Sequence, residues 1–237
     1  MIKKRSKHEG RCTVSIKKNL DMIVYEKIKD SLISGEYLQG QKIFVDELTD
    51  KYGVSRTPVI QAVKLLANER ILEVKSNGRI IVPQYDDKEI TDICKARILI
   101  ERFAVTEICD KKDGDAVESL MQPALLCGEY VKQGEYVKSC KEDLSFHKKM
   151  VALAGNDCIT DVYDSIQGRF LVASYLTMNS TSRMQGVASA DHMALLAYLK
   201  QFDKDKAIAL VEEHILSIRG QLLEIRKKSG FPVAYEM

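Results

Sequence analysis

The chain has 237 residues, and its 36 Lys and Arg nearly balance its 34 Asp and Glu, for a formal net charge of +2. A composition of 45% hydrophobic and 30% charged residues is typical of globular proteins and excludes disordered and fibrous classes. The longest apolar runs, such as residues 98–100, fall far short of the roughly 18–20 residues of a membrane span, and no apolar stretch follows the basic start as it would in a secretory signal. We therefore expect a cytoplasmic protein with no membrane partner.

Charge is unevenly distributed along the chain. Residues 1–85 contain 16 basic and 10 acidic residues, and the remainder contains 20 basic and 24 acidic residues. A basic N-terminal part joined to an acidic C-terminal part is typical of a nucleic-acid-binding module attached to a domain with another task. The alternative is a solvated basic tail, since residues 3–18 hold seven of the basic residues.

The N-terminal part contains the pattern of a helix-turn-helix. Apolar residues at helical spacing predict a helix over 22–33, a short one over 46–52 that ends at Gly53, and a third that begins after Ser55. Pro58 falls in the first turn of the third helix, where its missing N–H costs nothing. The short, glycine-containing turn between the last two helices is typical of helix-turn-helix proteins.

A β-hairpin is predicted directly after the third helix. Two β-branched runs, 71–74 and 79–82, are joined by residues 75–78, which end in the Asn-Gly pair of a tight hairpin turn. A hairpin in this place forms a wing. We therefore predict a winged helix-turn-helix domain over residues 21–85, preceded by a basic tail over residues 1–20.

Polar residues gather at the start of the third helix, which is the end that such proteins insert into the major groove of DNA. Arg56 can pair with a guanine edge or a phosphate, and Gln61, one turn further on, can read an adenine. Each of these residues, taken alone, is better explained as a solvated surface group or a helix cap, but together with the predicted fold they indicate DNA binding. The predicted DNA-binding residues are Ser55, Arg56, Thr57, Gln61, Lys75, Gly78 and Arg79.

Residues 86–230 contain a single proline and no alternating strand pattern. The helical spacing of their apolar residues predicts an antiparallel bundle of six helices. The predicted ranges are 87–111, 113–133, 135–154, 157–178, 182–201 and 204–228. The predicted fold class is therefore mainly α, with a small β-hairpin wing in the N-terminal domain and an all-α C-terminal bundle.

Three of the four histidines lie in this second domain, together with a suitably spaced carboxylate. Asp143 and His147 are four residues apart, so they project from one face of a helix. His192 and His214 have apolar neighbours and can face the bundle interior. One Asp and three His suit zinc, nickel, manganese or iron(II), and not calcium or magnesium. The alternative is that these histidines are hydrogen-bonded core residues, which is the commoner role of a lone His beside apolar residues.

The first domain resembles the DNA-binding domain of the GntR family of bacterial transcription regulators over residues 22–83. The resemblance rests on the Val-Ser-Arg-Thr-Pro-Val segment at 54–59 and on matching glycines and apolar residues around it. It implies a double-stranded DNA operator as partner. This chain has Gln39, Ile60 and Arg70 where family members commonly carry Pro, a basic residue and Gly, so the operator sequence stays open.

The second domain resembles the FCD effector domain of the FadR-like branch of that family. The resemblance implies a divalent transition metal in the bundle cavity, zinc or nickel first, with a small organic acid in its open coordination positions. The positions that match the family's metal ligands are Asp143, His147, His192 and His214.

Arg97 matches an arginine near the cavity of that family, where it could clamp the carboxylate of the acid. The alternative for Arg97 is an ordinary pair with Glu101, four residues further along the same helix. Arg169 and Asn179, with Ser174, are further candidates for lining the cavity.

Three functions remain open at this point. The first is a homodimeric regulator, most of which repress, that reads a pseudo-palindromic operator with an affinity set by the organic acid. The second is a regulator in which the metal ion itself is the effector. The third is a metalloenzyme, which is disfavoured because the bundle offers no general base beyond the ligands; no catalytic residue is assigned.

Overall fold

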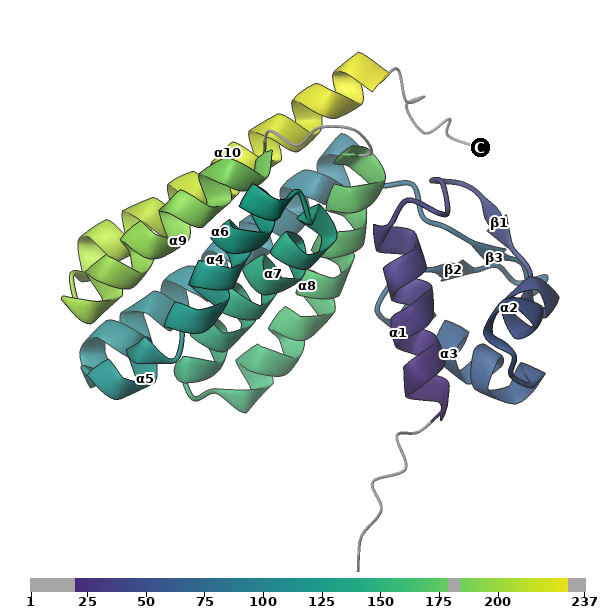
Figure 1. Cartoon of the computed structure of the whole chain (residues 1–237), viewed down its shortest axis with the longest axis horizontal. Helices are drawn as coiled ribbons and strands as arrows, with labels where there is room; N and C mark the ends of the chain where they lie inside the picture. Colours follow the sequence, from purple (N-terminus) through teal and green to yellow (C-terminus); the bar gives the residue numbers. More distant parts are fainter. Residues whose placement is uncertain (1–19, 179–183, 230–237) are drawn as a thin grey trace, which may run out of the picture.

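The computed structural model describes residues 20–178 and 184–229. Figure 1 shows a small head, made of three helices and a sheet, beside a larger helical bundle. The head consists of α1 (Leu20–Ile33), β1 (Lys42–Ile43), α2 (Val45–Tyr52), α3 (Arg56–Asn68), β2 (Glu73–Val74) and β3 (Ile80–Ile81). The bundle consists of α4 (Asp87–Lys111), α5 (Gly114–Glu118), α6 (Met121–Gln133), α7 (Tyr136–Leu153), α8 (Asp157–Met178), α9 (Met184–Lys200) and α10 (Lys204–Ser229). The predicted fold class is confirmed.

The helix-turn-helix consists of α2 and α3. Gly53 ends α2 with a φ of 65°, a left-handed conformation that glycine adopts without steric cost. Ser55 has the extended backbone of an N-cap residue, but its hydroxyl makes no capping hydrogen bond. Val59 and Leu66 of α3 are fully buried together with Leu48 of α2. This burial holds one side of α3 in the head and leaves its N-terminal residues at the surface.

The sheet contains one strand more than the sequence predicts. β1 pairs antiparallel with β3, and β3 pairs antiparallel with β2, so the strand order is β1-β3-β2. β1 spans two residues, which is too short for an alternating pattern. The turn between β2 and β3 is as predicted, because Gly78 has a φ of 78° and the Arg79 backbone N–H donates to Asn77 Oδ1 at 3.1 Å.

The single helix predicted over 113–133 is wrong, since the chain forms α5 and α6 there. Pro123 lies in the first turn of α6 and has no N–H to donate to the carbonyl of Ser119, so a continuous helix would lose a hydrogen bond at that point. Leu120, between the two helices, is fully buried and anchors the corner.

Helix α4 directly follows the segment that joins the head to the bundle. A capping box starts it, because the Glu89 backbone N–H donates to Asp86 Oδ1 at 2.7 Å while the Glu89 side chain accepts from the Asp86 N–H. Its middle turns bury two charged side chains, Arg97 and Glu101. Among the described helices, none is long and apolar enough to cross a membrane.

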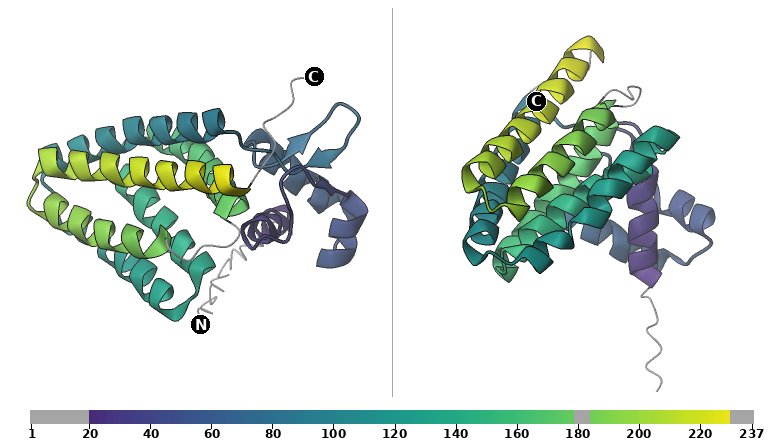
Figure 2. Two further views of the ribbon diagram at one scale, coloured as in Figure 1. Left: turned by 90° about the horizontal axis from the view of Figure 1, so that it is seen from above. Right: turned by 60° about the vertical axis from the view of Figure 1, so that its left-hand side comes forward.

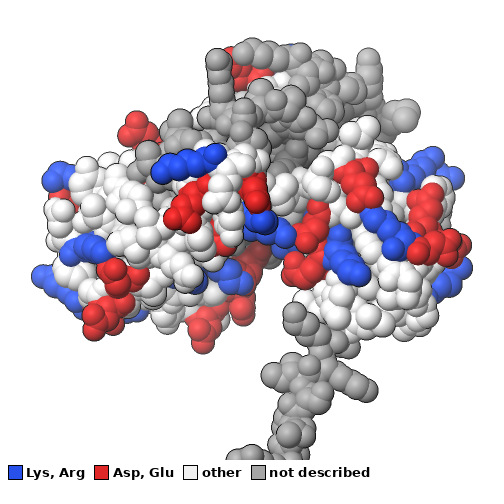
Figure 3. All heavy atoms as spheres, in the orientation of Figure 1, with Lys and Arg blue, Asp and Glu red and all other residues white. Residues whose placement is uncertain are grey.

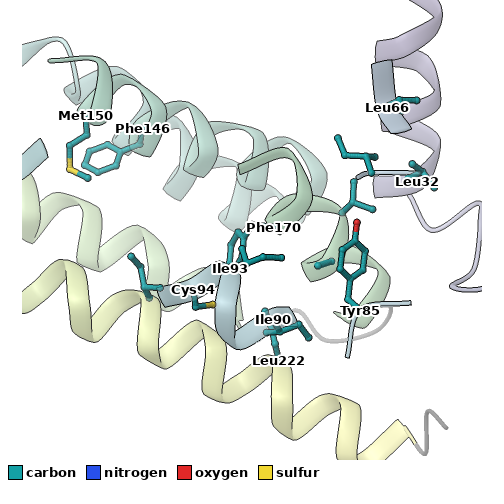
Figure 4. Close-up of a cluster of buried hydrophobic side chains, with 14 of the residues drawn as sticks. Leu32, Leu66, Tyr85, Ile90, Ile93, Cys94, Phe146, Met150, Phe170 and Leu222 are labelled. Carbon is teal, nitrogen blue, oxygen red and sulfur yellow. The ribbon is translucent and has the colours of Figure 1, made fainter. Parts of the chain in front are cut away.

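The head packs directly against the bundle. Figure 4 shows Leu32 of the head, Tyr85 of the connecting segment and Phe170 of α8 in one buried hydrophobic cluster. Helix α8 approaches the head closely, because a Cβ atom on Gly168 would lie 3.0 Å from Cδ1 of Ile71. Helix α8 therefore belongs to the bundle and also supports the head.

Candidate metal centre and DNA-binding surface

Three helices bring four potential metal ligands together inside the bundle. Asp143 and His147 come from α7, His192 from α9 and His214 from α10, and their ligand atoms all lie within 4.8 Å of one another. The three histidines are between 0% and 4% exposed. The structure therefore brings together all four residues that were predicted from the sequence as metal ligands.

The distances between these atoms suit a single ion. His192 Nε2 lies 3.2 Å from Asp143 Oδ1 and 3.2 Å from His147 Nε2, while His147 Nε2 lies 3.9 Å from Asp143 Oδ1. Two nitrogen ligands at tetrahedral angles around zinc lie about 3.4 Å apart. The His192 ring is also stacked on Phe146 with ring centroids 4.5 Å apart, which restricts its orientation.

Two further carboxylates orient the histidine rings. His147 Nδ1 lies 2.8 Å from Glu101 Oε2, and His214 Nδ1 lies 3.0 Å from Asp191 Oδ2. An N–H donated to the carboxylate from Nδ1 leaves the Nε2 lone pair free for a metal, as in many carboxylate–histidine–metal sites. Neither role is predicted by the sequence. For Asp191 the only sequence signal is its position next to His192.

Buried polar atoms that lack a hydrogen-bond partner among the described residues indicate whether an ion fits between these four ligands. His214 Nε2 and Asp143 Oδ1 are buried and have no hydrogen-bond partner among the described residues. Burial lowers the pKa of His147 to about 4, against the opposing effect of Glu101, so its ring is neutral at pH 7 and able to coordinate. The donor set and its unpaired atoms both fit a divalent transition metal.

Arg97 lies next to this cluster and is completely buried. Its Nε donates to Glu101 Oε1 at 2.9 Å, and its guanidinium carbon lies 4.3 Å from the centre of the Phe170 ring. Burial opposes ionisation of Glu101, but Arg97 and then His147 outweigh it and lower the pKa of that carboxyl. Nη1 and Nη2 of Arg97 have no hydrogen-bond partner within the described ranges. The helix-internal pair is therefore present, and it leaves two donor groups unused.

The other cavity candidates lie in different places. Arg169 lines a separate hollow of about 400 Å³ with residues of the connecting segment, and its Nη2 lies 3.8 Å from Glu89 Oε1. The helical turn explains this position, since Arg169 is displaced by roughly 120° around α8 from the side that carries Tyr163 and Phe170. Ser174 is buried with no partner for its hydroxyl among the described residues. Asn179 lies outside the described residues.

The predicted DNA-binding residues of α3 are on the surface of the head. Ser55, Arg56, Thr57 and Gln61 are all exposed, and so is the apolar Ile60 between them. Arg56 Nη1 lies 2.8 Å from Asp46 Oδ1 of α2, and both side chains are mostly exposed. This pair is therefore open to exchange for a base or phosphate.

The wing residues are exposed as well. Lys75, Gly78 and Arg79 lie in and beside the β2–β3 turn, and Lys75 pairs with Glu73. Figure 2, left, shows this hairpin extending away from the bundle. The N-terminal turn of α3 and the hairpin thus provide two exposed elements for a nucleic acid.

The head itself is not a basic surface. Figure 3 shows Lys and Arg interspersed with Asp and Glu on its visible face. Residues 20–85 hold nine basic and nine acidic residues, so the whole positive excess of the N-terminal part comes from residues 1–19. The alternative of a basic tail therefore accounts for the charge asymmetry.

Two family models match the chain in succession. The model described as bacterial regulatory proteins, gntR family, matches residues 22–82, and the FCD domain model matches residues 92–217. The chain belongs to the GntR family and carries an FCD domain. It is a transcription regulator with a DNA-binding winged helix-turn-helix, as the resemblance of both domains implies.

Two relatives of this chain are also named as transcription regulators. The Nta operon transcriptional regulator of Aminobacter aminovorans is 25% identical over 195 residues, which are 81% of this chain and 90% of the relative. The gluconate operon transcriptional repressor of Bacillus licheniformis is 18% identical over 205 residues, which are 84% of this chain and 83% of the repressor. The solved structure of Escherichia coli McbR/YncC superposes with a TM-score of 0.76 at 17% identity, covering 87% of this chain and 98% of that one, and supports the fold.

Proposed function

We propose that this GntR-family regulator represses transcription as a homodimer and leaves its operator when a small carboxylate binds in the FCD bundle. A divalent metal, zinc or nickel first, is held by the Asp143, His147, His192 and His214 set. The carboxylate would bind at that metal and at Arg97. The observation that carries the proposal is the buried guanidinium of Arg97, with Nη1 and Nη2 unpaired among the described residues, beside the four convergent ligand atoms.

The metal would supply a fixed positive centre for an anionic ligand. Four protein ligands leave one or two positions free when the ion is five- or six-coordinate. Glu101 and Asp191 hold the rings of His147 and His214 toward the ion in advance. Arg97 presents its two unused amino groups in the planar arrangement that matches a carboxylate.

A count of buried charges favours a monocarboxylate. With neutral histidines, a divalent ion and Arg97 supply three positive charges, and Asp143 and Glu101 supply two negative ones. Asp191 is left out of this count because its side chain is 28% exposed and stays in contact with solvent. One carboxylate neutralises the remaining positive charge, whereas a dicarboxylate would bury an uncompensated negative charge at high cost. The name of the Bacillus licheniformis relative refers to gluconate, which has a single carboxylate.

In the head, operator contacts are assigned to the α3 start and the wing. Arg56 and Gln61 read base edges, Ser55 and Thr57 bind phosphates, and the wing residues Lys75, Gly78 and Arg79 contact the neighbouring backbone. Exposed Ile60 is suited to an apolar contact with a thymine methyl group. Two heads in a homodimer would read the two half-sites of a pseudo-palindrome.

Metal analysis and a thermal-shift screen test this proposal. The purified chain should contain about one zinc or nickel ion, and the His192→Ala and His214→Ala variants should lose it. A panel of monocarboxylates and dicarboxylates should contain a monocarboxylate that raises Tm by about 5–10 °C at saturation, as expected for a ligand at 100 times its Kd. The shift should disappear after chelation, and the same compound should weaken operator binding.

Different results would identify the alternatives. An unchanged metal content in both histidine variants would contradict the ligand set. If no carboxylate stabilises the metal-loaded protein while the metal alone changes operator affinity more than about tenfold, the metal is the effector.

A further inference from the structure

A hollow of about 400 Å³ lies where the head meets the bundle (Figure 1). Its walls come from the end of α3 and from β2 in the head, and from the connecting segment, α4 and α8 on the other side. This space, called the junction hollow below, is lined by Arg70 and Arg169 among others, and by none of the four candidate metal ligands. Its volume falls within the range of about 300–1,000 Å³ that is typical of small-molecule sites.

Arg169 of α8 lines the junction hollow from the bundle. Its side chain is 20% exposed, and its Nε is buried with no hydrogen-bond partner among the described residues. Nη2 lies 3.8 Å from Glu89 Oε1, which is too far for a hydrogen bond. The Glu89 carboxylate is already engaged in the capping box of α4. Because a buried donor without an acceptor is costly, a further anion at Arg169 would be stabilised.

Arg70 lines the junction hollow from the head, and its backbone is unusual. The Arg70 N–H donates to the carbonyl of Ala67 at 3.0 Å. The next N–H, of Ile71, donates to the carbonyl of Leu66 at 2.8 Å, which completes the Schellman pattern at the end of α3. Arg70 therefore has a φ of 56°, a left-handed conformation that suits glycine and not a long side chain. The Tyr85 hydroxyl donates to the Arg70 carbonyl at 3.1 Å and so helps to hold this backbone.

The charges of the two arginines are only partly compensated. The Arg70 side chain has no ion pair or hydrogen bond within the described part of the chain. Of the two carboxylates in the lining, Glu73 is paired with Lys75, and Glu89 caps α4. The head and the bundle thus each contribute one guanidinium group that can accept an anionic partner.

We propose that the junction hollow is a second effector site, which binds a small organic phosphate between Arg70 and Arg169. A phosphate monoester carries close to two negative charges at pH 7 and three acceptor oxygens, enough for two guanidinium groups. Leu72 and Pro83 line the same space and offer apolar contacts to the carbon part of the ligand. The site differs from the metal site in place and in ligand.

The position of the junction hollow separates it from the predicted base contacts. Arg70 follows the C-terminal end of α3, whereas Arg56 begins this helix of 13 residues, so their backbones are roughly 20 Å apart. A ligand held by both arginines would link the head to the bundle and favour one arrangement of the two. It should therefore change operator affinity by the ratio of its affinities for the two arrangements.

Isothermal titration calorimetry of the full chain in phosphate-free buffer tests the site. Glycerol 3-phosphate or glucose 6-phosphate should bind at about one molecule per chain, inorganic phosphate should bind more weakly, and glycerol should not bind. Arg169→Gln and Arg70→Gly should each weaken binding about tenfold or more, as expected when a charged hydrogen-bonding partner is lost. Arg70→Gly also suits the left-handed backbone, so this variant should be folded and at least as stable as the wild type.

Two controls separate this site from other anion sites. Arg102→Gln removes an exposed arginine that pairs with Glu212 far from the lining, and it should leave phosphate binding unchanged. His192→Ala, which should empty the metal site, should also leave it unchanged. In the wild type the bound phosphate should change operator affinity about fivefold or more, and in Arg169→Gln this response should be lost.

Several results would overturn the junction hollow as an effector site. They are the absence of binding by both organic phosphates, equal affinity for inorganic phosphate, and binding that neither Arg70→Gly nor Arg169→Gln weakens. Loss of phosphate binding in His192→Ala alone would place the phosphate at the metal. Weaker operator binding by both arginine variants without any bound phosphate would assign the arginines to DNA. None of these results would decide whether a carboxylate binds at the metal, so the proposed function is tested separately.

Discussion

At the scale of single residues, the metal site depends on side chains that do not touch the ion. Glu101 accepts from His147 and from Tyr163 and is paired with Arg97, so one buried carboxylate joins the metal ligand to the predicted anion clamp. Asp191 contacts the Nδ1 atom of His214 but is not joined to Arg97 and is only half-buried. Replacing Asp191 is therefore the milder way to test whether such orientation matters.

Asp191→Asn should lower metal affinity by about 10–100-fold, because the amide no longer fixes the His214 ring with Nε2 toward the ion. Competition with a chromogenic chelator measures the affinity. Asp205→Asn, at an exposed position of the same helix as His214, is the control and should have no effect. Equal affinities for the wild type and Asp191→Asn would show that Asp191 does not orient His214.

At the scale of elements, α8 connects the ligand cavity with the head. It carries Tyr163 and Phe170 toward Glu101 and Arg97, and it carries Gly168 against Ile71 at the end of the helix-turn-helix. A glycine inside a helix costs about 1 kcal/mol relative to alanine. Ile71 lies so close to Gly168 that a larger side chain at position 168 would have little room, which explains the glycine in spite of its cost.

A double-mutant cycle measures that contact. In an Ile71→Val background, which lacks the Cδ1 atom, Gly168→Ala should stabilise the protein by up to about 1 kcal/mol through helix propensity. In the wild-type background the new methyl group meets Ile71 Cδ1 at 3.0 Å, so the gain should be lost or reversed. Urea unfolding should give a coupling of at least about 0.5 kcal/mol. Additive effects would mean that α8 and the head adjust freely to each other.

At the scale of the whole molecule, the net positive charge and the residues suited to base contacts lie in different parts of the chain. The head carries the residues suited to base contacts but no net charge, whereas residues 1–19 carry seven basic residues and one acidic residue. Phosphate contacts control the salt dependence of DNA binding, and base contacts control sequence preference. The two properties should therefore respond to different substitutions.

Replacing the seven basic residues of the tail with Gln should weaken binding to operator and random DNA alike and reduce the slope of log K against log salt by up to about six. Arg56→Ala should instead reduce the preference for operator by about 1–3 kcal/mol with little change in that slope. Fluorescence anisotropy at several salt concentrations measures both quantities. A tail variant with an unchanged salt slope would remove the tail from the DNA interface.

Much of the local structure could be predicted from the sequence, because it depends on neighbouring residues. Helical spacing predicts α1, α3 and most of the bundle, Gly53 and Gly78 mark the turns that they form, and four-residue spacing places Asp143 beside His147. The failures also have local causes. β1 is too short to produce a pattern. Pro123, in the first turn of α6, cannot donate a backbone hydrogen bond, so the single helix predicted over 113–133 divides into α5 and α6 although the flanking residues favour helix.

What only the tertiary structure decided is how residues distant in sequence meet. The sequence by itself determined a winged helix-turn-helix, a helical bundle and a set of residues able to bind a metal, since spacing and chemical type suffice for these. It did not determine that Glu101 and Asp191 orient the histidines, that Nη1 and Nη2 of Arg97 have no hydrogen-bond partner among the described residues, or that Arg169 faces another hollow. Those properties depend on how α4 packs against α7, α8 and α10. Packing is set by contacts across the whole domain, which no local pattern records.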